Sequence, residues 1–528
     1  MPVYLGSKKV SIQTSVTPEE PSVFIRDPYG NLIAEYIKDE FLLLDAYPTA
    51  PTLSGLTFQE YNWTLTDAKN YVRNYGWLDI GATYKPTSNL TEIDIIVDKV
   101  SGYNVILNMN GTINWGDGTS DTGSTSTTSH TYTDYGKYTI TCSGTINTTT
   151  ASVGLFGNLN STLKVVEIRL GTSITILGDY VFGNLTLLKS VIIPNTITAI
   201  NQYAFNICTF VDNLILPSSL TSIGNYAFTQ NRSQTYISMS NSITSMGQNL
   251  FASLNNLRRV CLPDNSNLTT FGQNGFNTNY GIETIVVPNS ITTLAYSGMY
   301  NCPNLKNLVL GNAITSILNS AIGSNSLQEL NITSSNTITI GGNSAIAVPN
   351  AKKIKITCPS LIIQYGYTFR GNSSVKEIIL PNNVTINAGL QYLFSGNYML
   401  EKINIPSTIT NLGASSFQNC YHLKIDVELP SGITAIDNYL FDSCYKIPSF
   451  TALGKITSVG TSAFSNCYAC LKYNFSHCDT VPTLSATNAF NNINKNAQII
   501  VPESLYETWI ATTNWVSYAN YIYKASEV

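Results

Sequence analysis

Ten cysteines and three histidines are the residues of this 528-residue sequence best suited to chemistry. Cysteine thiolates and histidine nitrogens bind zinc, and histidine is the most common general acid or base. Cys467 and Cys470, followed by His477 and Cys478, have the residue types of a zinc site. Because the second pair is adjacent rather than spaced, the alternative interpretation is that these thiols only pack in a core. Both interpretations stay open at this point, and we expect no metal and no cofactor.

Cysteine also recurs at one position of a repeated pattern, three residues after a large apolar residue that we call the anchor. A free cysteine in this setting behaves as a small hydrophobic residue. We therefore interpret these cysteines as buried fillers that form a ladder. They are Cys208, Cys302, Cys420, Cys444 and Cys467.

The sequence contains no motif of a known catalytic site. It lacks G-x-S-x-G, a phosphate-binding P-loop and H-E-x-x-H. Isolated carboxylates such as Asp426 and Glu428 do not show the pairing that a glycosidase needs. We therefore expect no enzyme, and a glycan-active enzyme is the weakest of three functional hypotheses.

The composition excludes several classes of protein. Charged residues make up 11% and hydrophobic residues 43%, so the chain is too apolar and too weakly charged to be disordered. The net charge of −4 gives no basic surface for nucleic acid. No apolar stretch approaches the ~18 residues that span a membrane, and the N-terminus does not read as a secretory signal. We expect no membrane insertion and no export signal.

The elements that position these residues come from a repeat, which begins near residue 163. LKSVIIPNTITAINQYAFNIC (188–208) and LEKINIPSTITNLGASSFQNC (400–420) show the pattern. Fourteen units follow one another at a nearly constant spacing, which favours an array of stacked coils. The anchor is Phe182, Phe205, Phe228, Phe251, Phe276, Met299, Ile322, Ile346, Phe369, Phe394, Phe417, Phe441, Phe464 and Phe490.

Each unit predicts two short strands and a corner. Leu188, Val191 and Ile193 should point inward, and Pro194 should end the first strand. Residues 197–200 alternate with a period of two and predict a second strand. Residues 203–205 then turn the corner, which we expect to be one helical or 3₁₀ turn.

These units resemble the leucine-rich repeats of BspA-like surface proteins, with a template close to L-x-x-I-x-I-P-x-S-V-T-x-I-G-x-x-A-F-x-x-C. The resemblance covers about 163–496. It implies a leucine-rich-repeat solenoid and, as a function, adhesion or recognition at an exposed surface. Met299, Ile322 and Ile346 lack the aromatic anchor, so we expect the middle coils to pack less regularly.

Residues 91–150 read as short alternating strands separated by turns. Trp115 and Tyr132 suit the core of a sandwich. The pattern W-G-D-G-T, followed by H-T-Y-x-x-x-G-x-Y-T-I, resembles PKD-type domains, which implies an immunoglobulin-like β-sandwich. Asp117 fits a turn residue, with a cation ligand as the alternative.

Residues 1–85 share neither pattern. Thr66 can cap a helix that ends at Gly76, with Ala68, Tyr71, Val72 and Tyr75 on its apolar face. The stretch GLTFQEYNWTLTDAK resembles N-terminal segments of virion structural proteins of tailed bacteriophages, which implies an attachment module. Residues 1–100 carry 8 basic and 13 acidic side chains, net −5, whereas the remaining 20 basic and 19 acidic side chains give net +1.

We predict a mainly β protein with a solenoid of about fourteen coils, preceded by a β-sandwich and a small α+β attachment segment. The predicted parts are an attachment segment (1–88), a PKD-like sandwich (89–150), the solenoid (151–496) and a C-terminal cap (497–528). In the cap, Pro502 should open a helix with Leu505, Trp509 and Ile510 at helical spacing. Trp515, Tyr518 and Ile522 should then cover the last coil.

The first strand of each coil has one position whose side chain points outward. This position is largely apolar in the first half of the array and polar in the second. Plain β propensity explains the apolar half, and the alternative is a stripe that packs on another chain or ligand. The resulting candidate partner-binding face is Ile192, Ile215, Val286, Val309, Lys355, Asn404 and Glu428.

The main functional hypothesis is a non-enzymatic virion surface protein of a tailed phage, a fibre or decoration protein. Its N-terminal segment would bind other virion proteins, and its repeat arm would bind a host-surface glycan or protein. We expect a homo-oligomer, with a trimer as one possibility, on the virion surface. A bacterial cell-surface adhesin of the BspA-like class is the alternative hypothesis.

Overall fold

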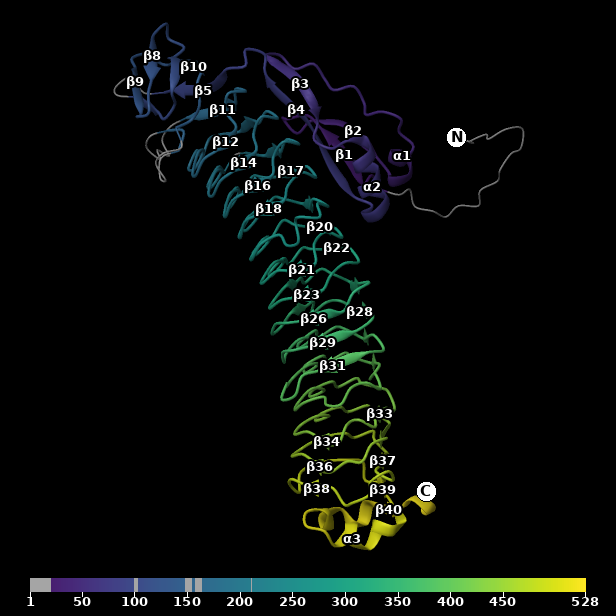
Figure 1. Ribbon diagram of the computed structural model, residues 1–528. Coiled ribbons are helices and arrows are strands. Elements are labelled where there is room, and N and C mark those ends of the chain that lie inside the picture. The colour runs from purple at the N-terminus through teal and green to yellow at the C-terminus, as the bar shows by residue number, and fades with distance from the viewer. Residues whose placement is uncertain (1–19, 99–102, 148–153, 157–163, 210) are drawn as a thin grey trace, which may run out of the picture.

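The computed structural model describes residues 20–98, 103–147, 154–156, 164–209 and 211–528. A long, gently curved arm of stacked coils carries two smaller units at its N-terminal end (Figure 1). The structure confirms the predicted fold class, a mainly β solenoid with few helices. Residues 1–19 of the predicted attachment segment lie outside the described residues.

Each coil contributes its first strand to a parallel ladder, which we call the front ladder. Most neighbouring strands pair in register, for example Leu330 with Ile354 and Ile354 with Ile378. The strands are β11 (Val165–Arg169), β13 (Ser190–Ile192), β15 (Asn213–Ile215), β17 (Tyr236–Ser238), β19 (Arg259–Cys261), β20 (Thr284–Val287), β22 (Asn307–Leu310), β25 (Glu329–Thr333), β28 (Lys353–Thr357), β30 (Glu377–Ile379), β32 (Lys402–Ile403), β33 (Val427–Leu429), β35 (Ser449–Ala452), β37 (Lys472–Asn474) and β39 (Gln498–Val501).

The second strand of most coils forms a back ladder of shorter parallel strands. It is built where the period-two pattern predicts it, as at Ala199–Ile200. The strands are β12 (Ile176–Leu177), β14 (Ala199–Ile200), β16 (Ser222–Ile223), β18 (Ser245–Met246), β21 (Thr293–Leu294), β23 (Ser316–Ile317), β26 (Ile338–Ile340), β29 (Leu361–Ile363), β31 (Val384–Ile386), β34 (Ala435–Ile436), β36 (Ser458–Val459) and β38 (Thr483–Leu484).

A single apolar core runs through the whole arm, because no coil can bury its own apolar residues. The anchor side chains are buried, and the rings of neighbouring aromatic anchors contact one another along the arm. Ring centroids lie 5.0 Å apart for Phe182 and Phe205 and 5.3 Å apart for Phe417 and Phe441. The predicted inward residues Leu188, Val191 and Ile193 are also buried.

The corner, as at residues 203–208, keeps the predicted 3₁₀-type hydrogen bonds only as single turns: Asn206 N–H donates to the Tyr203 carbonyl, and Cys208 N–H donates to the Phe205 carbonyl. These turns do not continue into a helix. The residue two before the anchor is left-handed, as at Tyr203 (φ 56°), and such a residue interrupts a right-handed helix. The backbone N–H groups of Tyr203, Phe205 and Ile207 instead donate to the carbonyl oxygens of the next coil, Asn225, Ala227 and Thr229. The corner therefore behaves as a third, irregular ladder.

The middle coils, which lack an aromatic anchor, add strands at this corner. β24 (Ile322–Gly323) pairs in parallel with β27 (Ile346–Ala347), and Met299 bridges to Ile322. β-branched isoleucine favours extended backbone, which accounts for the change. These coils are thus built differently at the corner but remain hydrogen-bonded and buried.

A C-terminal cap closes the last coil. It contains η1 (Glu503–Leu505), α3 (Tyr506–Ala511), η2 (Trp515–Tyr521), β40 (Ile522–Lys524) and η3 (Ala525–Glu527). Trp509 and Trp515 are fully buried, and β40 pairs with β39 as a final strand of the front ladder. The predicted covering residues therefore lie over the last coil, where Figure 1 shows α3 closing the arm.

The unit before the solenoid contains β5 (Thr91–Val97), β6 (Tyr103–Leu107), β7 (Gly111–Asn114), β8 (Ser120–Gly123), β9 (Thr128–Tyr132) and β10 (Gly136–Cys142). Trp115 and Tyr132 are buried in its core, as expected. Its sheet does not stop at the predicted boundary near residue 150, because β5 pairs with β11 and β11 pairs with β13. This unit therefore covers the first edge of the front ladder, as a solenoid cap must.

The N-terminal unit contains β1 (Val23–Arg26), β2 (Leu32–Tyr36), α1 (Lys38–Leu42), β3 (Leu56–Tyr61), α2 (Leu65–Tyr75) and β4 (Leu78–Pro86). Its sheet has the order β2-β1-β4-β3. The four predicted apolar residues of α2 are buried, and Gly76 ends the helix in a left-handed conformation. The N-cap is Thr64 rather than the predicted Thr66, because the Thr64 side chain accepts a hydrogen bond from the Asp67 backbone. No helix within the described ranges is long and apolar enough to cross a membrane.

Candidate recognition surface

The outward side chains of the front ladder form one continuous face, which we call the strand face. Its proximal part comprises β13 to β20 (residues 190–287), and its distal part comprises β25 to β39 (residues 329–501). Figure 1 shows the N-terminal unit lying against the proximal part and the distal part extending beyond it.

The apolar half of the predicted face is covered by the same chain, which corrects our expectation of a second chain or a ligand there. Ile192, Ile215 and Val286 are buried, at 1%, 5% and 0% exposure. Ile192 packs with Ala82 and Tyr84, and Val286 belongs to the core of the N-terminal unit. Val309 is half-buried at the edge of that core.

The close contact between the N-terminal unit and the front ladder explains why one position of β4 is glycine. A Cβ on Gly81 would lie 2.3 Å from Ile215 Cγ2, so only glycine lets β4 come this close to the ladder. Asn62, Trp63 and Tyr71 donate side-chain hydrogen bonds to the carbonyl oxygens of three successive coils. These carbonyls belong to Leu216, Met239 and Leu262, which occupy the same position of three successive repeats. The N-terminal unit therefore matches the period of the repeat.

A buried ion pair lies in the middle of this interface. Arg259 donates two hydrogen bonds of 2.8 Å to Asp79, and its guanidinium lies 4.3 Å from the Phe24 ring centroid. Burial alone acts to lower the pKa of Arg259, but Asp79 outweighs it and raises that pKa. Arg259 therefore keeps its charge, and its two hydrogen bonds to Asp79 hold β4 on β19.

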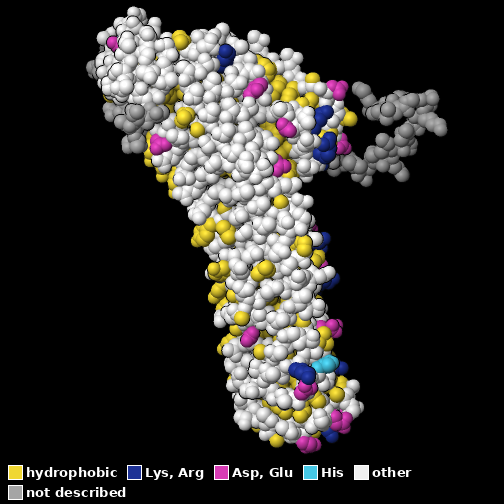
Figure 2. Space-filling view, in the orientation of Figure 1, with side chains coloured by type: hydrophobic (Ala, Val, Ile, Leu, Met, Phe, Trp, Pro, Cys, Tyr) yellow, Lys and Arg dark blue, Asp and Glu magenta, His cyan; other side chains and the backbone are white. Residues whose placement is uncertain are grey.

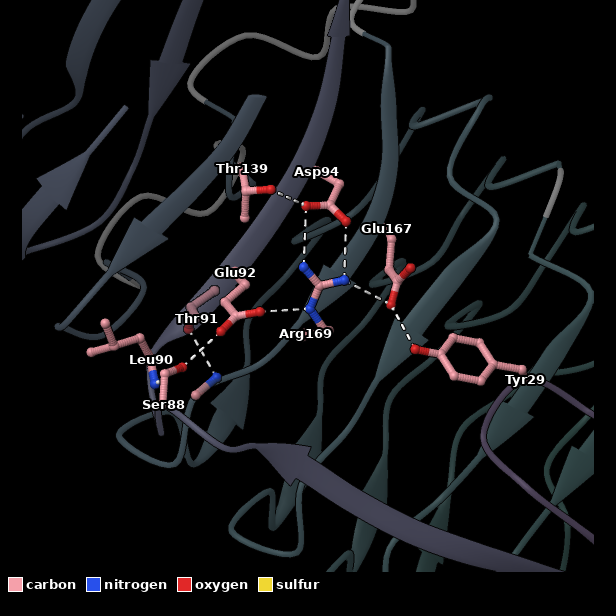
Figure 3. A network of polar contacts seen from close by, with 10 residues as sticks. Tyr29, Ser88, Leu90, Thr91, Glu92, Asp94, Thr139, Glu167 and Arg169 are labelled. Atoms are coloured by element: carbon pink, nitrogen blue, oxygen red, sulfur yellow. Dashed lines mark hydrogen bonds and ion pairs between the residues drawn. The ribbon is translucent and has the colours of Figure 1, made fainter. Parts of the chain in front are cut away.

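Arg169 joins three parts of the molecule at the start of the ladder (Figure 3). Its guanidinium contacts Glu92 at 2.7 Å and Asp94 at 3.0 Å, both in β5, and Glu167 at 3.0 Å in β11. Tyr29 of the N-terminal unit donates to Glu167 at 3.1 Å. Burial acts to lower the pKa of Arg169, but its acidic neighbours raise it overall, so this cation fixes the relative positions of the three parts.

The distal part of the strand face is open and polar. Lys355, Asn404 and Glu428 are all exposed there, which places the second half of the predicted face at the surface. Acidic and basic residues alternate along one row of β25 to β32, in the order Glu329, Lys353, Glu377 and Lys402. Lys353 contacts Glu377 at 2.8 Å. Across the visible surface of the arm, charged side chains are sparse, and most of the surface is backbone and side chains that are neither hydrophobic nor charged (Figure 2).

A break in the front ladder opens a cavity on the distal part. β32 and β33 do not pair, and a cavity of about 430 Å³ lies between their coils. Ile405, Ile425 and Leu453 provide apolar walls, and Asp426 and Glu428 provide carboxylates. Among the predicted site residues, Glu428 lines this cavity.

Sequence reasoning missed a ladder of stacked tyrosines on the distal coils. Tyr398, Tyr421, Tyr445 and Tyr468 have successive ring-centroid distances of 5.2, 4.8 and 5.3 Å. Tyr398 and Tyr468 are 45% and 50% exposed. The signal was available, because these tyrosines recur at one fixed position after the anchor, once in each of four successive repeats.

The cysteine ladder is structural. The Sγ of Cys208, Cys302 and Cys444 donates to the carbonyl of the preceding anchor, at 2.9 to 3.1 Å. Asn279 occupies the same position and donates to Phe251 in the same way. Cys467, Cys470 and Cys478 donate to three different carbonyls, and burial raises the pKa of each thiol. They therefore pack as neutral thiols.

The remaining candidate chemical groups are also accounted for. Within the described ranges no three or more His, Cys, Asp or Glu residues gather as metal ligands. Asp117 accepts hydrogen bonds from Thr119 and lies 2.7 Å from His130, as a turn residue does. Partial burial acts to raise the pKa of Asp117, but these hydrogen bonds lower it overall.

Comparison with known proteins shows a match to one family. The sequence pattern of the BspA type leucine rich repeat region, six copies, matches residues 156–267, 223–344, 297–424, 347–471 and 425–509. No curated protein matches the chain.

Several solved structures are similar in fold. A leucine-rich repeat protein from Bacteroides ovatus is 19% identical with a TM-score of 0.52, over 71% of this chain and 90% of its own. A leucine-rich cell surface protein from Faecalibacterium prausnitzii is 21% identical with a TM-score of 0.32, over 58% and 83%. A leucine-rich repeat protein from Eubacterium ventriosum is 18% identical with a TM-score of 0.36, over 74% and 95%.

Proposed function

This chain belongs to the BspA-type leucine-rich repeat family, and from that premise we propose that it is a cell-surface adhesion protein. Its distal strand face binds a macromolecule on another surface, without catalysis. The bacterial cell-surface adhesin thus replaces the virion surface protein as the leading hypothesis.

One observation carries this proposal: the strand face already holds a protein unit in its proximal part. There it uses outward side chains, carbonyl oxygens and an arginine to bind β4 and α2. The distal part repeats the same backbone geometry but is open, with exposed Lys355 and Glu428. A repeat array offers equivalent surfaces along its length, so the open part suits a second, external partner.

The proposal is tested by binding of the labelled full chain to cultured epithelial cells and to bacterial cells, measured by flow cytometry. The double substitution Lys355→Glu/Glu428→Lys keeps the net charge but reverses the charge at two exposed positions of the distal face. We expect it to weaken binding by about tenfold or more, as central interface residues do.

The matched control is Ser245→Lys/Thr385→Glu, which introduces one lysine and one glutamate at exposed residues of the back ladder and also keeps the net charge. It should bind like the unchanged chain. Equal loss in both variants, or no binding to any cell type, would reject the distal face as the recognition surface.

A virion surface protein is the second proposal, and it rests on the sequence resemblance of residues 55–69. Because β4 and α2 are occupied by the solenoid, attachment to a particle would use the outer surface, where Leu32 and Leu43 are 46% and 81% exposed. Capsid, portal or tail genes beside this gene would support the proposal of a virion surface protein. Genes for cell-wall assembly in their place would reject it.

A further inference from the structure

A groove lies where the N-terminal unit meets the loops of two solenoid coils, away from the distal strand face. Its volume is about 870 Å³, which is enough for several sugar rings or a short peptide. The N-terminal unit contributes aromatic walls, and the coils contribute Ser218, Asn241 and Ser242. Phe58, Tyr61 and Tyr47 give the groove an apolar, partly exposed surface.

Both sides of this groove are fixed. The Tyr61 hydroxyl donates to the carbonyl of Pro48 at 2.8 Å, and its ring packs on Tyr47 with centroids 4.6 Å apart. The Trp63 indole N–H donates to the carbonyl of Met239 at 2.6 Å. The groove is therefore formed before any ligand binds.

Two buried polar atoms of the groove residues have no hydrogen-bond partner within the described structure: the Tyr47 hydroxyl and Asn241 Oδ1. Unpaired buried polar atoms cost free energy, and a native protein usually pairs them with water or a ligand. Burial raises the pKa of Tyr47, so its hydroxyl keeps the proton and can donate or accept.

The charge of the lining restricts the chemistry of a ligand. It contains two carboxylates, Glu60 and Asp67, and no Lys, Arg or His. Neither carboxylate forms an ion pair with any of the described residues. Each instead accepts a hydroxyl hydrogen, Glu60 from Ser218 and Asp67 from Thr64. The lining thus repels anions and offers acceptors to a ligand rich in hydroxyl donors.

We propose that this groove binds an uncharged saccharide. A sugar ring presents an apolar C–H face to the aromatic wall and a rim of hydroxyl donors to Glu60, Asp67 and Asn241. A peptide offers fewer donors for the same length, and a cation would require the carboxylates to gather at one point rather than each pair with its own hydroxyl.

The experiment is calorimetric titration of the full chain with three neutral probes: cellotriose, maltotriose and chitotriose. We expect at least one to bind and Tyr47→Phe to weaken it by about three- to tenfold, which corresponds to one net hydrogen bond. The same variant should not lower the melting temperature, because it removes a hydroxyl that has no partner. Phe58→Ala should weaken binding further.

Tyr398→Phe, on the exposed tyrosine ladder, is the matched control and should bind each probe normally. No binding of any neutral probe would overturn the proposal, as would equal affinity of Tyr47→Phe and the control. Binding of tetramethylammonium or of a lysine peptide in place of the sugars would assign the groove to a cation. Lys355→Glu/Glu428→Lys should retain the sugar, so this result is independent of the distal face.

Discussion

At the residue scale, the left-handed backbone conformation recurs at fixed positions of the repeat. Both the residue two before the anchor and the residue two after it have positive φ in most coils, and most are Tyr, Asn or Ser rather than glycine. A non-glycine residue costs about 1 kcal/mol or more in this conformation, and a β-branched residue costs most. The repeat spacing could be read from the sequence. The strain could not, because tyrosine and serine give no signal of positive φ.

Ile207 is the least suited of these residues, with φ at 61°. Ile207→Asn should stabilise the chain by about 1 kcal/mol, because asparagine tolerates the left-handed region. Ile362→Asn is the control, since Ile362 is also half-buried but lies in β29 with ordinary strand backbone. Urea denaturation should show a higher midpoint for the first variant only. A lower midpoint for Ile207→Asn would contradict the account.

The buried thiols predict a loss of stability in alkali. Burial raises the pKa of Cys142 and Cys302 to about 12 and of Cys470 to about 11, above the usual ~8.5. At pH values between the usual and the raised pKa, the unfolded chain loses thiol protons that the folded chain keeps. The free energy of unfolding therefore decreases as the pH rises.

The measurement for this prediction is the urea midpoint under reducing conditions from pH 7 to pH 10. It should fall steadily above about pH 8.5, and Cys358→Ser should fall in parallel, because Cys358 is the one cysteine that is not fully buried. A midpoint that stays level to pH 10 would show that the thiols are not buried as described.

At the scale of elements, the sequence located most strands and the long helix but not their partners. The alternating pattern correctly placed the side chains of Ile192 and Ile215 on the outer side of the coils. They are nevertheless buried, because another part of the chain covers them. Their cover is β3, α2 and β4, whose own pattern reads as an ordinary small α+β unit. Contacts between segments far apart in the sequence, such as Asn62 with Leu216, leave no periodic signal.

The ion pair between β4 and β19 should be the strongest single contact of that interface. Arg259→Met leaves Asp79 buried and unpaired, which we expect to cost about 3–5 kcal/mol. Arg258→Met is the control, because Arg258 is largely exposed at the adjacent position and an exposed pair contributes little.

Hydrogen exchange monitored by mass spectrometry measures this directly. For Arg259→Met, exchange should rise in β4 and α2 and remain unchanged in the distal coils, because a repeat array transmits a change mainly to its neighbours. Unaltered exchange in residues 65–86 would show that the pair does not hold the N-terminal unit.

At the scale of the whole molecule, the chain is an arm that covers the proximal part of its strand face with its own N-terminal unit. The unit of β5 to β10 covers one end of the front ladder, and β40 with α3 covers the other. The constant spacing of the repeat predicted the long solenoid. The pattern of the C-terminal segment predicted the cap that closes its last coil. The apolar stripe stops at Val309 because the N-terminal unit that covers it ends there. This cause could not be read from the sequence.

The most direct test of this account is thiol accessibility along the strand face. In a Cys358→Ser background, whose other cysteines are buried, single substitutions Val286→Cys, Lys355→Cys and Glu428→Cys are labelled with a maleimide. The account predicts rapid labelling at positions 355 and 428 and protection at 286 until the chain unfolds. Rapid labelling at 286, or protection at 355 and 428 in the monomer, would contradict it.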